Sequence, residues 1–246
     1  MTEGRAALDD RTEKLSRTRR TIAARMVESL RVSAQLTTVL EADFLHVAAL
    51  RQQVKEAMLK DRGLKLSFLP FVAKAALDAL VRNPVINASL DMDKAEATYY
   101  AGRHLCVAVD TERGLLAPTI ASAGEMTVIE LAKAIVDIAD RARTGRLRAE
   151  ELSGGTFTIT NTGSRGALFD TPIINQPQVA ILGAGAIVER PVVVRLGADK
   201  AMEIRPMGYL ALSYDHRLVD GADAARYLSD VRQALETPDW GASVLG

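Results

Sequence analysis

The sequence predicts an α+β fold built on one mixed sheet. Helical and strand-like segments alternate along the chain, but without the regular strand, helix, strand rhythm of a doubly wound sheet. In the last third, strand-like segments joined by Gly, Pro and Asn become dominant. A chain of 246 residues, 48% of them hydrophobic, can bury about 70% of its unfolded surface in one large core or two small ones. One domain is the simpler prediction, and it extends over residues 16–246.

The N-terminal part of this domain is expected to form three helices and one strand. Residues 1–15 carry many charges and no sustained apolar period, which is typical of a flexible arm or linker remnant. Apolar residues at helical spacing predict helices over 17–30 and 48–61, and β-branched residues predict a strand over 35–43. A further helix over 67–82 is apolar on nearly every face, so we expect other elements to cover it on most sides.

The middle of the chain predicts short strands and then a long helix. Residues 95–109 are expected to form two strands joined around Gly102, and residues 110–114 a turn before a strand-like segment over 115–120. A strong apolar stripe predicts a helix over 127–143. The C-terminal third follows with four expected strands and a final helix, over 156–160, 179–187, 191–196, 202–213 and 222–235.

Composition excludes several classes of function. Thirty-one basic and thirty-one acidic residues cancel, and only 4% of residues are aromatic, so we expect no nucleic-acid partner. No apolar run approaches eighteen residues and no signal peptide is visible, which predicts a cytoplasmic protein with no membrane partner. The single cysteine, Cys106, lies in a strand-like segment and is expected to be a buried thiol. One cysteine and three widely separated histidines do not form a metal site of ordinary spacing, so no metal is expected.

Glycine motifs do not indicate a nucleotide site. The stretch Gly183-Ala-Gly-Ala-Ile187 follows a strand but lacks the third glycine of a dinucleotide fingerprint, and Pro191 interrupts any helix after it. Close backbone packing is the favoured interpretation. The patterns of P-loop hydrolases, of esterases with a GxSxG elbow and of HExxH proteases do not occur either.

Two polar strand ends are candidates for chemistry. The expected strand over 156–160 places three threonine hydroxyls on one face, and it leads into Asn161. Taken alone, such hydroxyls are expected to satisfy neighbouring polar groups. The strand Tyr209–Asp215 delivers His216 to a loop four residues before Asp220. Imidazole titrates near neutrality and can move a proton, but a histidine and an aspartate at this spacing are weak signals by themselves.

Six motifs together resemble the catalytic domain of the dihydrolipoamide acyltransferases, the core components of 2-oxo acid dehydrogenase complexes. They occur in matching order and are Arg19-Arg-Thr-Ile-Ala-Ala-Arg-Met26, Leu66-Ser-Phe-Leu-Pro-Phe71, Val107-Ala-Val-Asp-Thr-Glu-Arg-Gly-Leu115, Gly154-Gly-Thr-Phe-Thr-Ile-Thr-Asn161, Pro177-Gln-Val-Ala-Ile-Leu-Gly183 and Asp215-His-Arg-Leu-Val-Asp-Gly221. The resemblance runs over residues 16–235. Within the family, Gly166-Ala-Leu-Phe-Asp-Thr-Pro172 is most similar to actinobacterial members.

The resemblance implies a chloramphenicol acetyltransferase-like fold that assembles as a homotrimer with active sites between subunits. The family's catalytic histidine falls on His216, its acidic partner on Asp220 and its oxyanion-stabilising hydroxyl on Thr160. We expect Asp220 to orient the loop, through an arginine of the first helix such as Arg20. Positions that contact coenzyme A, a substrate of the reaction, fall on Arg51, Ser67, Asp110, Thr160, Asn161, Gly185 and Ala186.

The same resemblance implies partners that this sequence does not contain. The acyl group would arrive on a lipoyl domain, and the decarboxylase and dihydrolipoamide dehydrogenase of the complex would act before and after it. The lipoyl and subunit-binding domains are either truncated here or belong to another chain. Acetyl is the first expected acyl group, with branched-chain acyl and succinyl as alternatives. An acetyltransferase of the chloramphenicol-resistance type, a structural core without turnover, and a trimer or a 24-subunit assembly all stay open.

Overall fold

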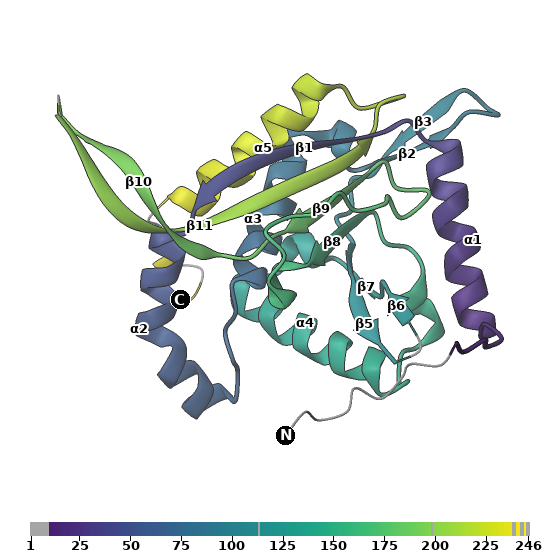
Figure 1. Ribbon diagram of the computed structural model, residues 1–246, viewed down its shortest axis with the longest axis horizontal. Coiled ribbons are helices and arrows are strands. Elements are labelled where there is room, and N and C mark those ends of the chain that lie inside the picture. Colours follow the sequence, from purple (N-terminus) through teal and green to yellow (C-terminus); the bar gives the residue numbers. More distant parts are fainter. Residues whose placement is uncertain (1–9, 113, 198, 238–239, 242–243, 245–246) are drawn as a thin grey trace.

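A seven-stranded mixed sheet forms the centre of the computed structural model, with helices packed against one of its faces (Figure 1). The structure describes all residues except 1–9, 113, 198, 238–239, 242–243 and 245–246. The strand order is β1-β11-β9-β8-β4-β7, and β10 pairs with the first half of β11. Strands β4, β8 and β9 run parallel and the other neighbours antiparallel, so the predicted α+β fold with a mixed sheet is confirmed.

The long helices lie close to their predicted ranges. Their bounds are α1 Arg17–Val32, α2 Leu45–Arg62, α3 Leu69–Arg82, α4 Val128–Arg143 and α5 Gly221–Glu236. Four 3₁₀ turns complete the set: η1 Pro84–Ile86, η2 Ala123–Glu125, η3 Ala149–Leu152 and η4 Gly163–Arg165. Helix α4 begins where its sequence favours a start, because Thr127 and Glu130 form a capping box.

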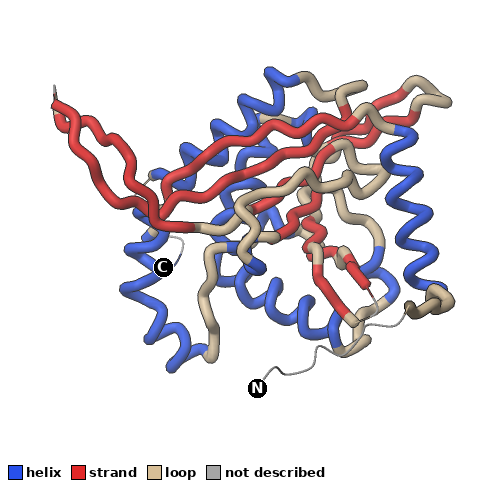
Figure 2. Tube along the Cα trace, in the orientation of Figure 1, coloured by secondary structure: helices blue, strands red, loops and turns tan. Residues whose placement is uncertain are grey.

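The strands are short except for β1, β10 and β11. Their bounds are β1 Gln35–Asp43, β2 Ala88–Asp91, β3 Glu96–Tyr99, β4 Leu105–Val107, β5 Val109–Thr111, β6 Gly114–Leu116, β7 Thr119–Ile120, β8 Phe157–Asn161, β9 Ala180–Ala184, β10 Val188–Leu196 and β11 Asp199–Asp215. The pairs β2–β3 and β5–β6 form separate hairpins. Figure 2 shows the hairpin of β10 and β11 extending away from the body of the molecule.

The core lies between the sheet and α3, α4 and α5. Helix α3 buries nine of its fourteen residues, as its all-round apolar sequence predicts. On β8, Phe157 and Ile159 point into this core, and the Phe157 ring packs edge-on against Tyr227 of α5 at a centroid distance of 5.9 Å. Side chains alternate along a strand. The threonines of β8 therefore point to the opposite face of the sheet, where residues 162–178 run.

Some expected boundaries are wrong. Asp110 and Thr111 belong to β5 and Gly114 begins β6, so the turn expected over 110–114 does not include these three residues. The segment expected over 115–120 is broken into β6 and β7, with Pro118 between them, because proline cannot donate to a strand ladder. The strand expected over 179–187 ends at Ala184, and β11 exceeds its predicted range at both ends.

The first helix has an apolar stripe that its own chain leaves mostly uncovered. Ile22 and Met26 are half-buried, whereas Val27 and Leu30 are 68% and 53% exposed. Figure 1 shows α1 standing beside the body of the molecule. The projecting hairpin likewise exposes Met202 and Val193, which pair across β10 and β11.

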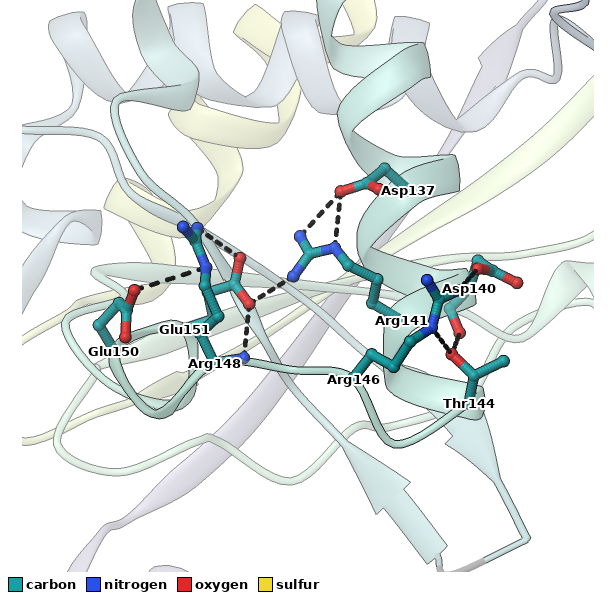
Figure 3. A network of polar contacts seen from close by, with 8 residues as sticks. All are labelled: Asp137, Asp140, Arg141, Thr144, Arg146, Arg148, Glu150 and Glu151. Atoms are coloured by element: carbon teal, nitrogen blue, oxygen red, sulfur yellow. Dashed lines mark hydrogen bonds and ion pairs between the residues drawn. The ribbon is translucent and has the colours of Figure 1, made fainter.

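An arginine and glutamate network fixes the segment that leads into β8 (Figure 3). Glu151 is buried, and its carboxylate accepts hydrogen bonds from Arg141 at 2.5 Å and from Arg148 at 2.8 Å. These contacts lower the pKa of Glu151 to about 2, since both arginines stabilise the charged form. Arg141 also donates to Asp137 one turn earlier on α4. The network thus ties η3 to α4.

Candidate active site

A cavity of about 300 Å³ opens where the C-terminal ends of β8 and β9 face the start of α3. Its walls include Ser67, Asn161, Gly185 and Ala186, four of the seven positions predicted to contact coenzyme A. These residues come from three separate parts of the sequence, and the sheet brings them together because β8 and β9 are parallel neighbours. A cavity of this size can hold part of an elongated ligand.

Glycines allow the backbones that form this cavity to approach one another. A Cβ atom on Gly163 would collide with the backbone of Gly185, and one on Gly185 would collide with the carbonyl oxygen of Leu168. The close packing predicted for the Gly183–Ile187 stretch is therefore confirmed. The turn after β8 is fixed locally, because the Ser164 N–H donates to Asn161 Oδ1 at 3.1 Å.

Two of the other three positions expected to contact coenzyme A, Arg51 and Asp110, border the cavity without lining it. Arg51 of α2 donates through Nε to the carbonyl of Leu66 at 2.8 Å, and its guanidinium lies 4.8 Å from the ring centre of Phe68, a wall residue. Asp110 on β5 forms an ion pair with Arg165, which follows the wall residue Ser164. Both charged side chains therefore lie next to residues that border the cavity wall, Arg51 beside Phe68 and Asp110 beside Arg165.

Thr160 differs from the two threonines before it. Thr158 Oγ1 donates to Gln178 at 2.6 Å, and Thr156 Oγ1 accepts from the His104 N–H at 3.1 Å, so the expectation of satisfied hydroxyls holds for both. The Thr160 hydroxyl has no hydrogen-bond partner in the described part of the chain, and the residue is half-buried. It is next to Asn161 at the end of β8 and is free to donate to a ligand.

The loop that carries His216 is held from several sides. The buried carboxylate of Asp215 accepts hydrogen bonds from Arg217 and from the Ala34 N–H, and the ion pair raises the pKa of Arg217. The His216 N–H donates to the carbonyl of Ala34 at 2.8 Å. These bonds fix the backbone while the imidazole, with 41% of its surface exposed, stays accessible.

Asp220 lies beside the imidazole. Its Oδ1 is 3.7 Å from His216 Nδ1, and its N–H donates to Asp223 Oδ2 at 3.0 Å at the start of α5. Among the described residues, no ion pair joins Asp220 to Arg20, the arginine suggested as an intermediary. The orienting role expected of Asp220 stays a prediction, since at 3.7 Å its carboxylate lies beyond hydrogen-bond distance of the ring nitrogen.

One chain does not bring His216 and Thr160 together. Thr160 pairs with Gly183, and Gly183 pairs with Ala211 of β11. His216 comes five residues after Ala211, just past the end of β11 and in the direction away from the end of β8, which is roughly 17 Å along the strands at about 3.3 Å per residue. No hydrogen bond spans such a distance. A single substrate would therefore meet both side chains only where two copies of the chain adjoin.

The cavity also contains residues that the sequence did not indicate. Phe44, Phe68 and Tyr209 form an aromatic part of its wall. Arg190 donates to the Tyr209 hydroxyl at 2.7 Å and stacks 4.7 Å from its ring centre. Aromatic residues make up only 4% of this chain, and that scarcity was the available signal for these three. Among the described residues, no cluster of three or more histidine, cysteine or acidic side chains could hold a metal ion, and no helix could cross a membrane.

Relatives of the chain are known from sequence. It is 53% identical over 232 residues to the dihydrolipoyllysine-residue acetyltransferase component of the pyruvate dehydrogenase complex of Mycobacterium bovis, covering 94% of this chain and 42% of that protein. It is 44% identical to the mitochondrial dihydrolipoyllysine-residue succinyltransferase component of the 2-oxoglutarate dehydrogenase complex of Sus scrofa, covering 92% of this chain and 49% of that protein. The chain thus spans less than half the length of these relatives. The expected resemblance to actinobacterial members is confirmed.

Solved structures agree with this relationship. A probable dihydrolipoamide acetyltransferase from Listeria monocytogenes superposes with a TM-score of 0.88 at 31% identity, covering 93% of this chain and 95% of that one. The cubic core of a pyruvate dehydrogenase multienzyme complex gives 0.87 at 33% identity, with 96% and 94% covered. A chloramphenicol acetyltransferase gives 0.54 at 17% identity, with 87% and 94% covered, and shows the shared fold. Since residues 7–240 also match the corresponding family description, the chain belongs to the 2-oxoacid dehydrogenases acyltransferase (catalytic domain) family.

Proposed function

We propose that this chain transfers an acyl group, acetyl in the first place, between S-acyl dihydrolipoyl-lysine and coenzyme A. The observation that carries the proposal is the cavity at the end of β8, which gathers four expected coenzyme A positions, among them Asn161, the residue after Thr160. Family membership supports the same chemistry. Coenzyme A would enter as a substrate, and its thiol would point toward Thr160.

In the proposed mechanism His216 acts as general base. A free thiol with a pKa near 8.5 is mostly protonated at neutral pH, and the thiolate is the nucleophile, so the imidazole removes the proton of the coenzyme A thiol. The sulfur attacks the thioester carbonyl, and Thr160 donates a hydrogen bond to the resulting oxyanion. When the tetrahedral intermediate collapses, the carbon–sulfur bond to the dihydrolipoyl group breaks, and the proton on His216 passes to the departing sulfur.

The mechanism requires His216 and Thr160 from different copies, and we propose a homotrimer that supplies them. The separation of roughly 17 Å within one chain supports this arrangement. The exposed apolar face of α1, which includes Val27 and Leu30, supports it as well. The similarity to a cubic core is compatible with trimers that pack into a 24-subunit assembly. The expected location is the cytoplasm, and the expected partners are a lipoyl domain, a 2-oxo acid decarboxylase and dihydrolipoamide dehydrogenase.

The proposed acyl group is acetyl because the 53% identical relative is an acetyltransferase component. Succinyl is the second candidate, since succinyltransferase components are similar over almost the same span of this chain. Branched-chain acyl groups stay an alternative from the sequence. Steady-state kcat/KM values with acetyl-CoA, succinyl-CoA and isobutyryl-CoA, each with dihydrolipoamide as acceptor, measure this preference directly.

Subunit complementation tests the proposed site. His216→Ala and Thr160→Ala variants should each lose activity, by about a hundredfold or more for the loss of an oxyanion donor. If chains from both variants are unfolded, mixed equally and refolded, about a quarter of the sites in random closed trimers should unite an intact His216 with an intact Thr160. Recovery near that fraction supports the shared site. No recovery from refolded mixed trimers contradicts it, and equal turnover by His216→Ala and the parent would refute the catalytic assignment. A parent trimer without turnover would favour a structural core.

A further inference from the structure

Asp170 presents an unusual carboxylate beside the candidate active site. It lies in the segment between η4 and β9. Its Oδ1 atom is buried and has no hydrogen-bond partner in the described part of the chain. Buried carboxylate oxygens without a donor are rare, because their lost hydration is not compensated. Burial raises the pKa of Asp170 for this reason. A carboxylate that is desolvated without a compensating hydrogen bond is a candidate for a functional role.

The position of Asp170 relative to Thr160 follows from Gly183. The Asp170 Oδ1 atom is 3.2 Å from the place where a Cβ on Gly183 would be. Gly183 is the register partner of Thr160 in the parallel pair of β8 and β9. Side chains of paired residues point to the same face of a sheet, and the strands are about 4.8 Å apart. The Asp170 carboxylate therefore lies over the same face as the Thr160 hydroxyl, one strand away.

The charge of Asp170 is not neutralised by a cation. Two other acidic groups near the site have arginine partners: Asp215 pairs with Arg217, and Asp110 pairs with Arg165. Among the described residues, no lysine, arginine or histidine lies within ion-pair distance of Asp170. A partly buried environment screens charges less than water does, so an uncompensated carboxylate acts on other charges over several ångströms.

We propose that Asp170 is a specificity-determining residue, which favours uncharged acyl groups such as acetyl and disfavours acyl groups that end in a carboxylate, such as succinyl. The inference rests on the proposed function, because Thr160 marks where the thioester carbonyl binds. A succinyl group carries its carboxylate two methylene groups from that carbonyl, and this places a second negative charge near Asp170. Like charges brought close together act against binding of the wrong substrate. An acetyl group adds no charge and meets no such repulsion.

Charge-changing variants test the proposal at pH 8, about four units above the ordinary pKa of aspartate. Asp170→Asn keeps the shape and removes the charge, so the ratio of kcat/KM for succinyl-CoA to that for acetyl-CoA should rise at least about tenfold. Asp170→Glu retains the charge and should leave the ratio within about twofold of the parent. Asp61→Asn, at an exposed position near the end of α2, changes the net charge equally and should leave the ratio unchanged.

A merely structural role for Asp170 would lower both kcat/KM values and leave their ratio unchanged. An unchanged ratio in Asp170→Asn, with an active parent, would overturn the inference and leave the proposed function standing. A parent without acetyl transfer would refute the proposed function. The ratio of the Kd values for succinyl-CoA and acetyl-CoA, measured by calorimetry, would then decide the inference: it should fall at least about tenfold in Asp170→Asn, and an unchanged ratio would refute the role of Asp170.

Discussion

Replacing Glu151 by glutamine should destabilise the chain by about 3 kcal/mol at pH 7. The pKa of Glu151 falls from 4.5 to about 2 through its contacts with Arg141 and Arg148, and one pKa unit corresponds to about 1.4 kcal/mol. The side chain is only 7% exposed, so solvent weakens the interaction little. For a chain of this length, the loss should lower the Tm by about 6–12 °C.

The destabilisation caused by Glu151→Gln should depend on pH. The folded pKa of Glu151 lies below its unfolded value, so its contribution is fully present above pH 4.5 and disappears as the pH falls toward 2. Urea unfolding followed by circular dichroism, at one protein concentration, should give a difference between parent and Glu151→Gln that shrinks to about half at pH 3. The remaining difference should vanish as the pH falls through 2.

The neighbouring Glu150 provides a matched control. It pairs with Arg148 at 3.4 Å but is 69% exposed, so Glu150→Gln should cost less than about 1 kcal/mol. If Glu150→Gln and Glu151→Gln were equally destabilising, burial would not be the reason for the effect. If the Glu151→Gln difference were the same at pH 7 and pH 3, the charged pairs shown in Figure 3 would not stabilise this segment, and the reasoning would fail.

Three further changes follow from the site. Thr160→Ser keeps a hydroxyl and should retain kcat within about tenfold of the parent, whereas Thr160→Ala should lose about a hundredfold in kcat at nearly constant KM; equal kinetics of both variants would argue against an oxyanion donor. Gly185→Ala forces a Cβ into the carbonyl oxygen of Leu168, so coenzyme A affinity measured by calorimetry should fall, and an unchanged Kd would contradict the close packing. Asp215→Ala leaves the half-buried Arg217 without its partner, so the free energy of unfolding measured in urea should fall by about 2–4 kcal/mol. Its kcat should fall as well.

Local patterns were enough to predict most elements. The apolar period over residues 127–143 and the capping pair of Thr127 and Glu130 determine α4 without help from the rest of the chain. Local pattern also predicts helix α3 and its burial, because its sequence is apolar on nearly every face. The β2 strand was not predicted, since its four residues carry no alternation and are set by pairing with β3.

The sequence indicated only some of the residues of the candidate site. Motif resemblance indicated His216, Thr160 and four residues that now line one cavity. It did not indicate the aromatic wall that includes Tyr209, nor the isolated carboxylate of Asp170. Such groups become neighbours through strand register, and register depends on pairings between residues far apart in the chain.

The sequence by itself determined the fold class, the family and the residue types available for acyl transfer, because periodicity, turn residues and ordered motifs are local properties of the chain. The tertiary structure decided the distances between them. The direction of β11 against β9 places His216 and Thr160 at different levels of the sheet, and Gly183 leaves room for Asp170 beside Thr160. Spatial separation and burial are consequences of packing the whole chain, so the distance between His216 and Thr160, on which the proposed shared site rests, and the uncompensated charge of Asp170 emerge only from the folded molecule.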